Sequence, residues 1–278
     1  MVYSGNKLSS AFKDIDLDNF SNSFVPYLYL DGHRSSSVGS TDFEKYSSGF
    51  RFFLRFGQIM QNLGFKEMVT MVHTSRNCSL RDRLNSIISA IQENFDISNS
   101  YLKNSKFKLY GDLASYKDMG YPDFFNFITQ INNNNHREYS FTHHILTNYS
   151  ENWALNNLDR IKEIPEISAI IRFTKGFASG GWIPVKMQET TFIYSQIPSV
   201  SEYWSDEAIE ALIYISLQNW SLMRQYIGKK VYANSEKELI HSERDVQLKF
   251  CTQKLDIKNS VHNRIIAFGI HGPVIYEF

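Results

Sequence analysis

Short apolar runs and amphipathic stretches alternate along most of this chain. Apolar runs that end in polar residues predict six strands, at 25–30, 67–73, 106–110, 140–147, 168–172 and 190–195. Apolar residues at helical spacing predict helices at 41–64, 79–95, 121–133, 151–162 and 205–227. The first helix opens with a capping box, in which Thr41 is followed by Glu44. Strands and helices in this alternating order favour an α/β fold with a central, mostly parallel sheet flanked by helices.

The two ends of the chain depart from this central pattern. Residues 1–24 are polar and mixed, and we interpret them as an N-terminal extension. Residues 25–228 hold the alternating pattern and predict one α/β domain. Residues 229–278 are interpreted as a C-terminal extension that packs on the same domain or on a dimer partner. Within it, 236–255 is a charged helical stretch and 264–278 is an apolar segment that could add a strand.

Composition narrows the classes of function. The chain has 278 residues, of which 42% are hydrophobic and 15% aromatic, enough to bury a substantial core. Its 29 basic and 29 acidic residues balance and form no basic run, which argues against non-specific nucleic-acid binding. Cys78 and Cys251 stand far apart and outside any zinc pattern. Neither a signal peptide nor a transmembrane segment is visible, so we expect a cytoplasmic protein.

The end of the first strand carries the most suggestive polar residues. Four apolar or aromatic residues, 27–30, are followed directly by Asp31, Gly32, His33 and Arg34. Glycine allows a turn that other residues resist, and ligands in open α/β sheets bind just beyond the carboxyl ends of the strands. An acid beside two potential cations at that place favours a site for a metal and an anionic substrate. The alternative interpretation is an ordinary strand followed by a surface turn.

Two further strands deliver polar residues to the same edge. The second strand ends before Ser75 and Asn77, and the fifth ends at Arg172, followed by a glycine-bearing loop that contains Ser179. An acid, cations and small hydroxyl or amide groups suit Mg²⁺ with a diphosphate, because hard oxygen ligands hold the metal and arginines share the phosphate charge. The common nucleotide-binding motifs GxxxxGK[ST] and GxGxxG are missing from the sequence.

The histidines on the predicted strands favour packing over catalysis. His143 and His144 are adjacent on one strand and therefore point to opposite faces, so they cannot hold one metal together. His73 ends the second strand and is interpreted as a packed histidine rather than a base.

Several short motifs, in order along 25–228, resemble those of the cis-prenyltransferases, the undecaprenyl diphosphate synthase-like enzymes. They lie at the ends of predicted strands, near the start of the first helix or within the sixth strand, as the family's motifs do. They are Leu30-Asp31-Gly32-His33-Arg34, Tyr46-Ser47-Ser48-Gly49, His73-Thr74-Ser75-Arg76-Asn77-Cys78, Gly111-Asp112-Leu113, Asn148-Tyr149, Ile171-Arg172-Phe173 and Thr191-Phe192-Ile193-Tyr194. No single motif is strong, but their order on the matching elements is hard to produce by chance.

This resemblance implies a homodimer with a hydrophobic tunnel that acts on isoprenyl diphosphates. It implies Mg²⁺-dependent ionisation of an allylic diphosphate, followed by carbon–carbon bond formation. In that scheme Asp31 assists the metal-bound diphosphate, and Arg34 with the backbone N–H groups of 32–34 holds the allylic diphosphate. Ser75 and Asn77 position diphosphate or the proton that leaves the second substrate.

The departures from the family pattern concern the second substrate. The family has a second arginine six residues after the one matched by Arg172, and then a serine, to bind isopentenyl diphosphate. Here the arginine is missing; Lys175 supplies a charge without a guanidinium's bidentate fork, and Ser179 is the nearby serine. A late metal-binding glutamate of the family is replaced by Thr191, with Glu189 two residues away.

Three functions remain open on this evidence. The favoured one is a prenyl diphosphate enzyme with non-standard chemistry, which couples allylic units in an irregular linkage or cyclises one of them. Ordinary cis chain elongation with isopentenyl diphosphate is the conservative alternative. The third is a non-catalytic, prenyltransferase-like subunit, against which the presence of Asp31 argues.

Overall fold

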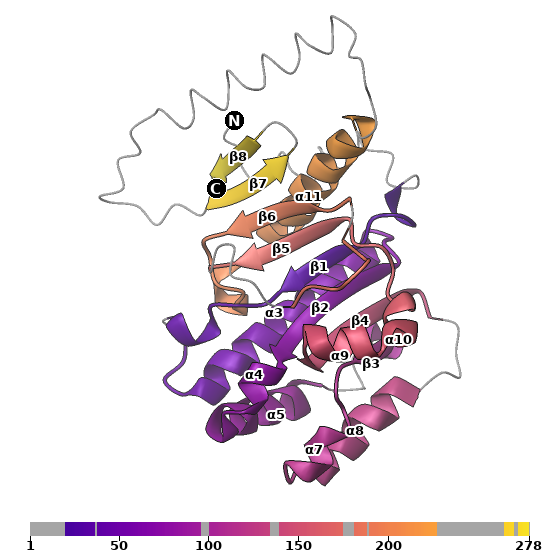
Figure 1. Cartoon of the computed structure of the whole chain (residues 1–278). Coiled ribbons are helices and arrows are strands. Elements are labelled where there is room, and N and C mark those ends of the chain that lie inside the picture. The colour runs from indigo at the N-terminus through magenta and orange to yellow at the C-terminus, as the bar shows by residue number, and fades with distance from the viewer. Residues whose placement is uncertain are drawn as a thin grey trace, which may run out of the picture.

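An eight-stranded sheet forms the middle of the computed structural model, which describes residues 20–36, 38–95, 100–133, 139–174, 181–187, 189–226, 264–269 and 272–277 (Figure 1). Its strands lie in the order β3-β4-β2-β1-β5-β6-β7-β8. Their bounds are β1 Pro26–Tyr29, β2 Glu67–Thr74, β3 Ser105–Tyr110, β4 Phe141–Tyr149, β5 Ala169–Phe173, β6 Thr191–Ser195, β7 Arg264–Gly269 and β8 Gly272–Glu277. The strands β1 to β6 are parallel, whereas β7 and β8 form an antiparallel hairpin that pairs with β6.

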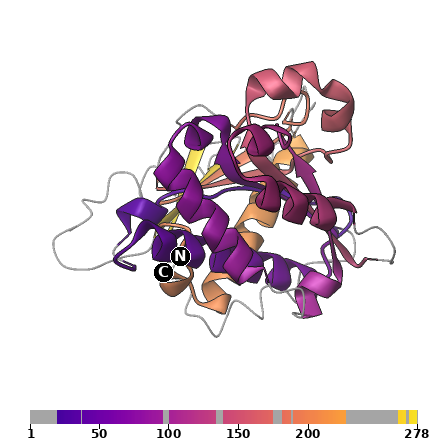
Figure 2. The same cartoon turned by 90° about the horizontal axis from the view of Figure 1, so that it is seen from below.

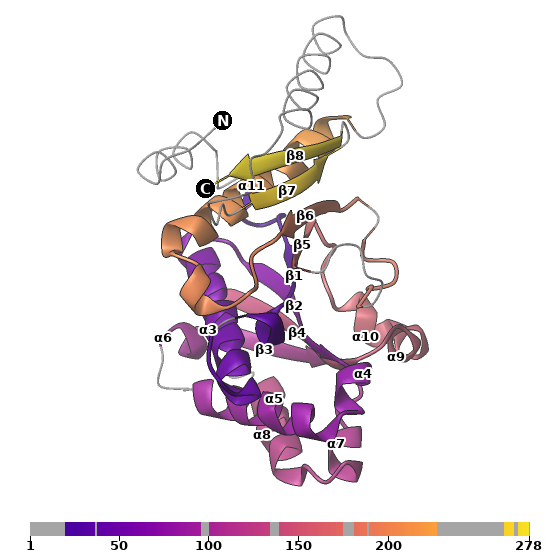
Figure 3. The ribbon, with the colours of Figure 1, turned by 90° about the vertical axis from the view of Figure 1, so that its left-hand side faces the viewer.

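Helices cover both faces of this sheet (Figures 2 and 3). One face packs against α3 (Asp42–Asn62), α5 (Arg81–Asn94), α8 (Pro122–Asn133) and α11 (Asp206–Tyr226). The other face packs against α9 (Glu151–Asn156), α10 (Leu158–Lys162) and the segment 181–187. Shorter helical turns complete the described part, at η3 His33–Ser35, α4 Ser75–Cys78, α6 Ser100–Lys103, α7 Ser115–Asp118 and η4 Ser201–Tyr203. The predicted α/β class, with a central parallel sheet between helical layers, is confirmed.

The burial of the central strand β1 on both faces explains why its sequence is almost wholly apolar. Leu28 is buried in the cluster beneath α3, while Tyr27 is buried in the cluster beneath α9 and α10. A strand with helices on both faces offers no solvent side for a polar residue, so apolar residues stand next to one another instead of alternating. The run of apolar residues therefore indicates that β1 is a central strand, covered on both faces.

Helix α3 begins and ends where the sequence predicts. Thr41 caps its first turn, and Glu44 returns the bond to the backbone of Thr41, so the capping box is formed. Backbone hydrogen bonds from Thr41 and then Ser40 lower the pKa of Glu44 to about 2. Gly64, with a φ of +87°, follows the end of the helix. The aromatic side chains of α3 that face the sheet are buried: Phe50, Phe52, Phe53 and Phe56.

Some predicted elements are divided in the structure. The helix expected over 79–95 is present as α5, which begins only at Arg81 because Leu80 takes an extended conformation; the short helix α4 precedes that prediction. The helix expected over 151–162 breaks at Asn157 into α9 and α10. The apolar segment 264–278 supplies two strands, β7 and β8, instead of one. The helical stretch predicted at 236–255 and residues 1–19 lie outside the described residues.

Candidate functional site

The loop after β1 is held in place by a serine that is distant from it in the sequence. The Asp31 backbone N–H donates to Ser199 Oγ at 3.0 Å across 168 residues of sequence. In return, the backbone N–H of Ser199 donates to the Asp31 carbonyl oxygen at 3.1 Å. The Asp31 carboxylate accepts the N–H of Gly32 at 2.8 Å. Both the backbone and the side chain of Asp31 are thus oriented at the carboxyl end of β1.

Gly32 lets this loop approach its neighbour closely. Its φ is +88°, and a Cβ at this position would lie 2.6 Å from Thr174 Cγ2 and 3.0 Å from Pro198. A side chain here would both strain the backbone and push against the turns that follow β5 and β6. Glycine is therefore required for the contact between these turns and the Asp31 loop.

His33 is held on the helix side of the same loop. Its Nε2 lies 3.0 Å from Ser199 Oγ, and its ring meets Tyr46 of α3 edge-on, with centroids 5.9 Å apart. A Cβ at Gly49 would lie only 2.3 Å from His33 Nε2, so the ring occupies the space that this glycine leaves. The imidazole thereby docks the loop on α3. The Tyr46–Gly49 motif is explained by this contact.

Positive charge lies beside this loop. Arg34 is exposed, and its carbonyl accepts a hydrogen bond from Lys45 Nζ at 3.3 Å. Burial raises the pKa of the Tyr46 hydroxyl, while the positive charges of Arg34 and Arg83 act in the opposite direction. Arg83, on α5, was not among the residues that the sequence singled out. Both arginines act on the same tyrosine as Asp31 does.

Arg172 reaches the same edge from β5. Its register partners are Tyr29 on β1 and Tyr194 on β6, and its guanidinium carbon lies 4.2 Å from the centroid of the Tyr29 ring. Burial raises the pKa of Tyr29, Arg172 lowers it, and Asp31 raises it again. Asp31 and Arg172, which the sequence analysis identified independently, therefore both influence the pKa of the same tyrosine.

The remaining predicted residues lie one strand away or outside the described part. Ser75 and Asn77 stand in α4, directly after β2, and β2 is the parallel neighbour of β1. Ser75 is exposed and Asn77 half-buried. Lys175 and Ser179 lie outside the described residues. The predicted residues 31–34 thus follow β1 directly, and Arg172 lies near the end of the neighbouring strand β5.

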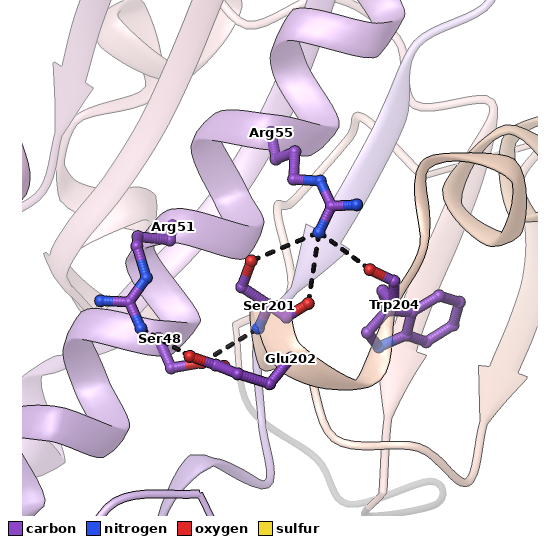
Figure 4. A network of polar contacts seen from close by, with 6 residues as sticks. All are labelled: Ser48, Arg51, Arg55, Ser201, Glu202 and Trp204. Atoms are coloured by element: carbon purple, nitrogen blue, oxygen red, sulfur yellow. Dashed lines mark hydrogen bonds and ion pairs between the residues drawn. The ribbon is translucent and has the colours of Figure 1, made fainter.

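The segment after β6, which carries Ser199, is anchored on α3 by a polar network (Figure 4). Ser48 donates to the Glu202 carboxylate and accepts the backbone N–H of Ser201. Arg55 donates to the carbonyl oxygens of Ser201, at 3.3 Å, and of Trp204, at 2.8 Å. This network fixes the turn that contains Ser199, and Ser199 holds Asp31.

The buried histidines have packing partners, as the sequence suggests. His73 lies within hydrogen-bond distance of Tyr116 Oη, at 2.6 Å, and burial lowers its pKa to about 4. His143 contacts the hydroxyl of Tyr101, and His144, on the opposite face, contacts that of Tyr110. Cys78 is buried and free, and burial raises its pKa to about 12, so its thiol is unreactive.

The donor set suits a metal that is shared with a substrate. Within the described ranges, no group of three or more His, Cys, Asp or Glu side chains could hold a metal ion. Mg²⁺ in diphosphate sites is commonly bound by one or two carboxylates together with phosphate oxygens and water. Asp31 at a strand end, with arginines nearby, fits that arrangement.

Comparison with known proteins finds the same fold. No family model and no curated protein matches the sequence. Two solved structures match the chain over 70% of its length and 94% of theirs. One is lavandulyl diphosphate synthase from Lavandula x intermedia in complex with dimethylallyl diphosphate, 13% identical, with a TM-score of 0.50. The other is a probable undecaprenyl diphosphate synthase from Campylobacter jejuni, 10% identical, with a TM-score of 0.53.

This chain has the cis-prenyltransferase fold. The structural match confirms the resemblance that the strand-end motifs indicated, at an identity low enough to mark a divergent member of the fold. None of the helices in the described part of the chain is long and apolar enough to cross a membrane.

Proposed function

We propose that this protein is a Mg²⁺-dependent prenyl diphosphate transferase that ionises an allylic diphosphate and then couples or cyclises it. The observation that carries the proposal is Asp31 at the end of β1 in a cis-prenyltransferase fold: Ser199 holds its backbone, and the backbone N–H of Gly32 donates to its carboxylate. A similar structure binds dimethylallyl diphosphate, which is the class of substrate proposed here.

The residues of this chain have distinct roles in the proposed reaction. Asp31 would hold Mg²⁺, which when bound shares the charge of the diphosphate. Arg34 and the backbone N–H groups of the loop bind the allylic diphosphate, while the His33 ring fixes that loop on α3. The carbon–oxygen bond breaks with its electron pair leaving on the diphosphate, so these cations stabilise the charge that develops there.

The carbon–carbon bond then forms when a π bond attacks the allylic cation, and a proton is lost afterwards. Ser75 and Asn77 would position the diphosphate or that departing proton. Arg172, Lys175 and Ser179 would bind the diphosphate of a second substrate. A homodimer is part of the proposal, because the resemblance implies one.

Ordinary cis elongation is the second candidate. The likeness to a probable undecaprenyl diphosphate synthase favours it. The missing second arginine favours irregular coupling or cyclisation, because a lysine binds a diphosphate without bidentate geometry. A non-catalytic subunit would bind prenyl diphosphates without turning them over.

Product analysis tests these alternatives. The purified protein is incubated with Mg²⁺ and dimethylallyl, geranyl or farnesyl diphosphate, each with and without isopentenyl diphosphate. Lengthening that depends on isopentenyl diphosphate identifies elongation, and products from an allylic substrate alone identify coupling or cyclisation. Binding without release of diphosphate identifies a non-catalytic protein.

The variant Asp31→Asn tests the mechanism. We expect release of diphosphate to fall at least about a hundredfold, because the neutral amide is a poor metal ligand. Asp159→Asn is the matched control, since Asp159 is exposed and pairs with Lys162 on α10. An Asp31→Asn protein as active as the wild type contradicts the proposed role of Asp31.

A further inference from the structure

Two tyrosines flank Arg172 at the carboxyl edge of the sheet. Tyr29 on β1 and Tyr194 on β6 are its register partners on the two neighbouring strands. Partners in register point to the same face of a sheet, so the three side chains form a row across β1, β5 and β6. The guanidinium carbon of Arg172 lies 4.2 Å from the centroid of the Tyr29 ring. This distance is well within the range of a cation–π contact.

Tyr29 contacts the arginine itself, whereas Tyr194 contacts the turn that follows it. Tyr29 stacks on the guanidinium and also shares a hydrogen bond with it; burial nevertheless keeps the pKa of its hydroxyl raised. Tyr194 donates from its hydroxyl to the carbonyl oxygen of Thr174, at 2.7 Å. Thr174 has a φ of +57°, which is strained for a β-branched residue, so Tyr194 helps to fix the turn that follows Arg172. The contact with Tyr29 thus restricts the guanidinium itself, and the contact of Tyr194 fixes the turn that follows it.

Stacking leaves the chemistry of a guanidinium intact. The aromatic ring covers its face, whereas its N–H groups donate in its own plane. An arginine ordered in this way loses less side-chain entropy when it binds a phosphate through two parallel hydrogen bonds. A ring beneath the guanidinium therefore raises the affinity of an arginine for a diphosphate.

We propose that Tyr29 is a positioning residue that orders Arg172 for a diphosphate bound at the carboxyl edge of β1 and β5. The identity of the ligand rests on the proposed function; the positioning of Arg172 rests on the stacked geometry. The acids Asp31 and Glu151 also act on Tyr29. Mg²⁺ at Asp31 would offset this negative charge, so the site is expected to bind diphosphate better with Mg²⁺ than without it.

Inorganic pyrophosphate in the presence of Mg²⁺ is a direct probe of this site. Binding to the full-length protein is measured by calorimetry for Tyr29→Leu, which removes the ring, and Tyr29→Phe, which keeps the ring and removes the hydroxyl. We expect Tyr29→Leu to weaken binding about tenfold and Tyr29→Phe about threefold. Tyr27→Phe is the matched control, because Tyr27 lies on the same strand and face but donates to Gly181 O at 2.6 Å. It should change binding less than twofold.

A double-mutant cycle separates positioning from a general loss of structure. If Tyr29 acts through Arg172, Tyr29→Leu should cost little more in an Arg172→Gln background, where the residue it orders is already gone. Additive losses would overturn the inference, and so would a Tyr29→Leu protein that binds pyrophosphate like the wild type and like Tyr27→Phe. A wild-type protein that does not bind pyrophosphate would also overturn it.

Turnover of prenyl diphosphates decides the proposed function separately. Pyrophosphate binding that depends on Tyr29, without turnover of any prenyl diphosphate, supports the inference and contradicts the enzyme function. Turnover of a prenyl diphosphate, together with pyrophosphate binding that the Tyr29 variants leave unchanged, supports the function and contradicts the inference. The two proposals can therefore fail independently.

Discussion

Gly32 and Gly64 adopt nearly the same backbone conformation, with φ values of +88° and +87°, in different surroundings. A Cβ at Gly32 would meet Thr174 and Pro198, whereas a Cβ at Gly64 would meet no atom within 4 Å. The pair separates two costs that are usually mixed, namely backbone strain and steric contact. At the residue scale, Gly32 is therefore the position on which the geometry of the Asp31 loop depends.

Alanine at each glycine measures the two costs. We expect Gly64→Ala to lower the free energy of unfolding by about 1 kcal/mol, from backbone strain alone. Gly32→Ala should cost about 3 kcal/mol, because the contact with Thr174 adds to the strain. Denaturant unfolding of both variants tests this. Equal losses would mean that the loop moves aside without cost.

At the scale of elements, α3 and the turn after β6 act as one unit. Arg51 and Arg55 lie one turn apart on α3 and pair with Glu202 and Asp206, each at 2.6 Å. Burial raises the pKa of Glu202, but hydrogen bonds from Ser48 and Arg51 outweigh it and leave the pKa lowered. Arg55 also donates to two backbone carbonyls of the turn. The two arginines therefore differ in what their removal would leave unpaired.

Methionine in place of each arginine keeps the aliphatic stem and removes the charge. We expect Arg55→Met to destabilise the protein by about 1–2 kcal/mol, because the Trp204 carbonyl loses the donor that Arg55 supplies and the Ser201 carbonyl keeps only the backbone N–H of Trp204. Arg51→Met should change stability by less than about 0.5 kcal/mol, since its ion pair with Glu202 is largely exposed. Urea unfolding measures both. A larger effect for Arg51→Met would contradict this account of the network.

At the scale of the whole molecule, three buried histidines on the sheet make the stability of the fold sensitive to acid. Burial lowers the pKa of His73 to about 4, of His143 well below its usual value, and of His144 below it as well. Unfolding returns each to an ordinary value of about 6.5. Below that pH the unfolded chain binds protons that the folded protein does not, so stability falls as the pH falls.

Replacing His73 tests this linkage. Between about pH 6.5 and 4.5, His73 alone should contribute about 1 kcal/mol per pH unit to the loss of stability. In His73→Gln we expect the slope of unfolding free energy against pH to decrease by about that amount. The readout is the slope, so any constant loss of stability in the variant does not affect it. An unchanged slope would show that His73 is protonated in the folded protein.

The sequence by itself determined the order of elements and the first half of the candidate site. Helix α3, its capping box and the parallel strands follow from local spacing and burial on both faces, which neighbouring residues record. Asp31 and Arg172 were visible because both end apolar runs. The break at Asn157 was not, since it depends on a backbone angle that tertiary packing selects.

Only the tertiary structure decided which residues hold Asp31 and Arg172 in place. Ser199 lies in a turn without a motif and is separated from Asp31 by 168 residues. Tyr29 read as one more apolar strand residue until the register placed it against Arg172. Local pattern shows that a residue faces the sheet, but strand order and register determine its partner across the sheet. The local sequence pattern was thus enough to indicate the candidate residues, whereas the side chains that position them became known only from the tertiary structure.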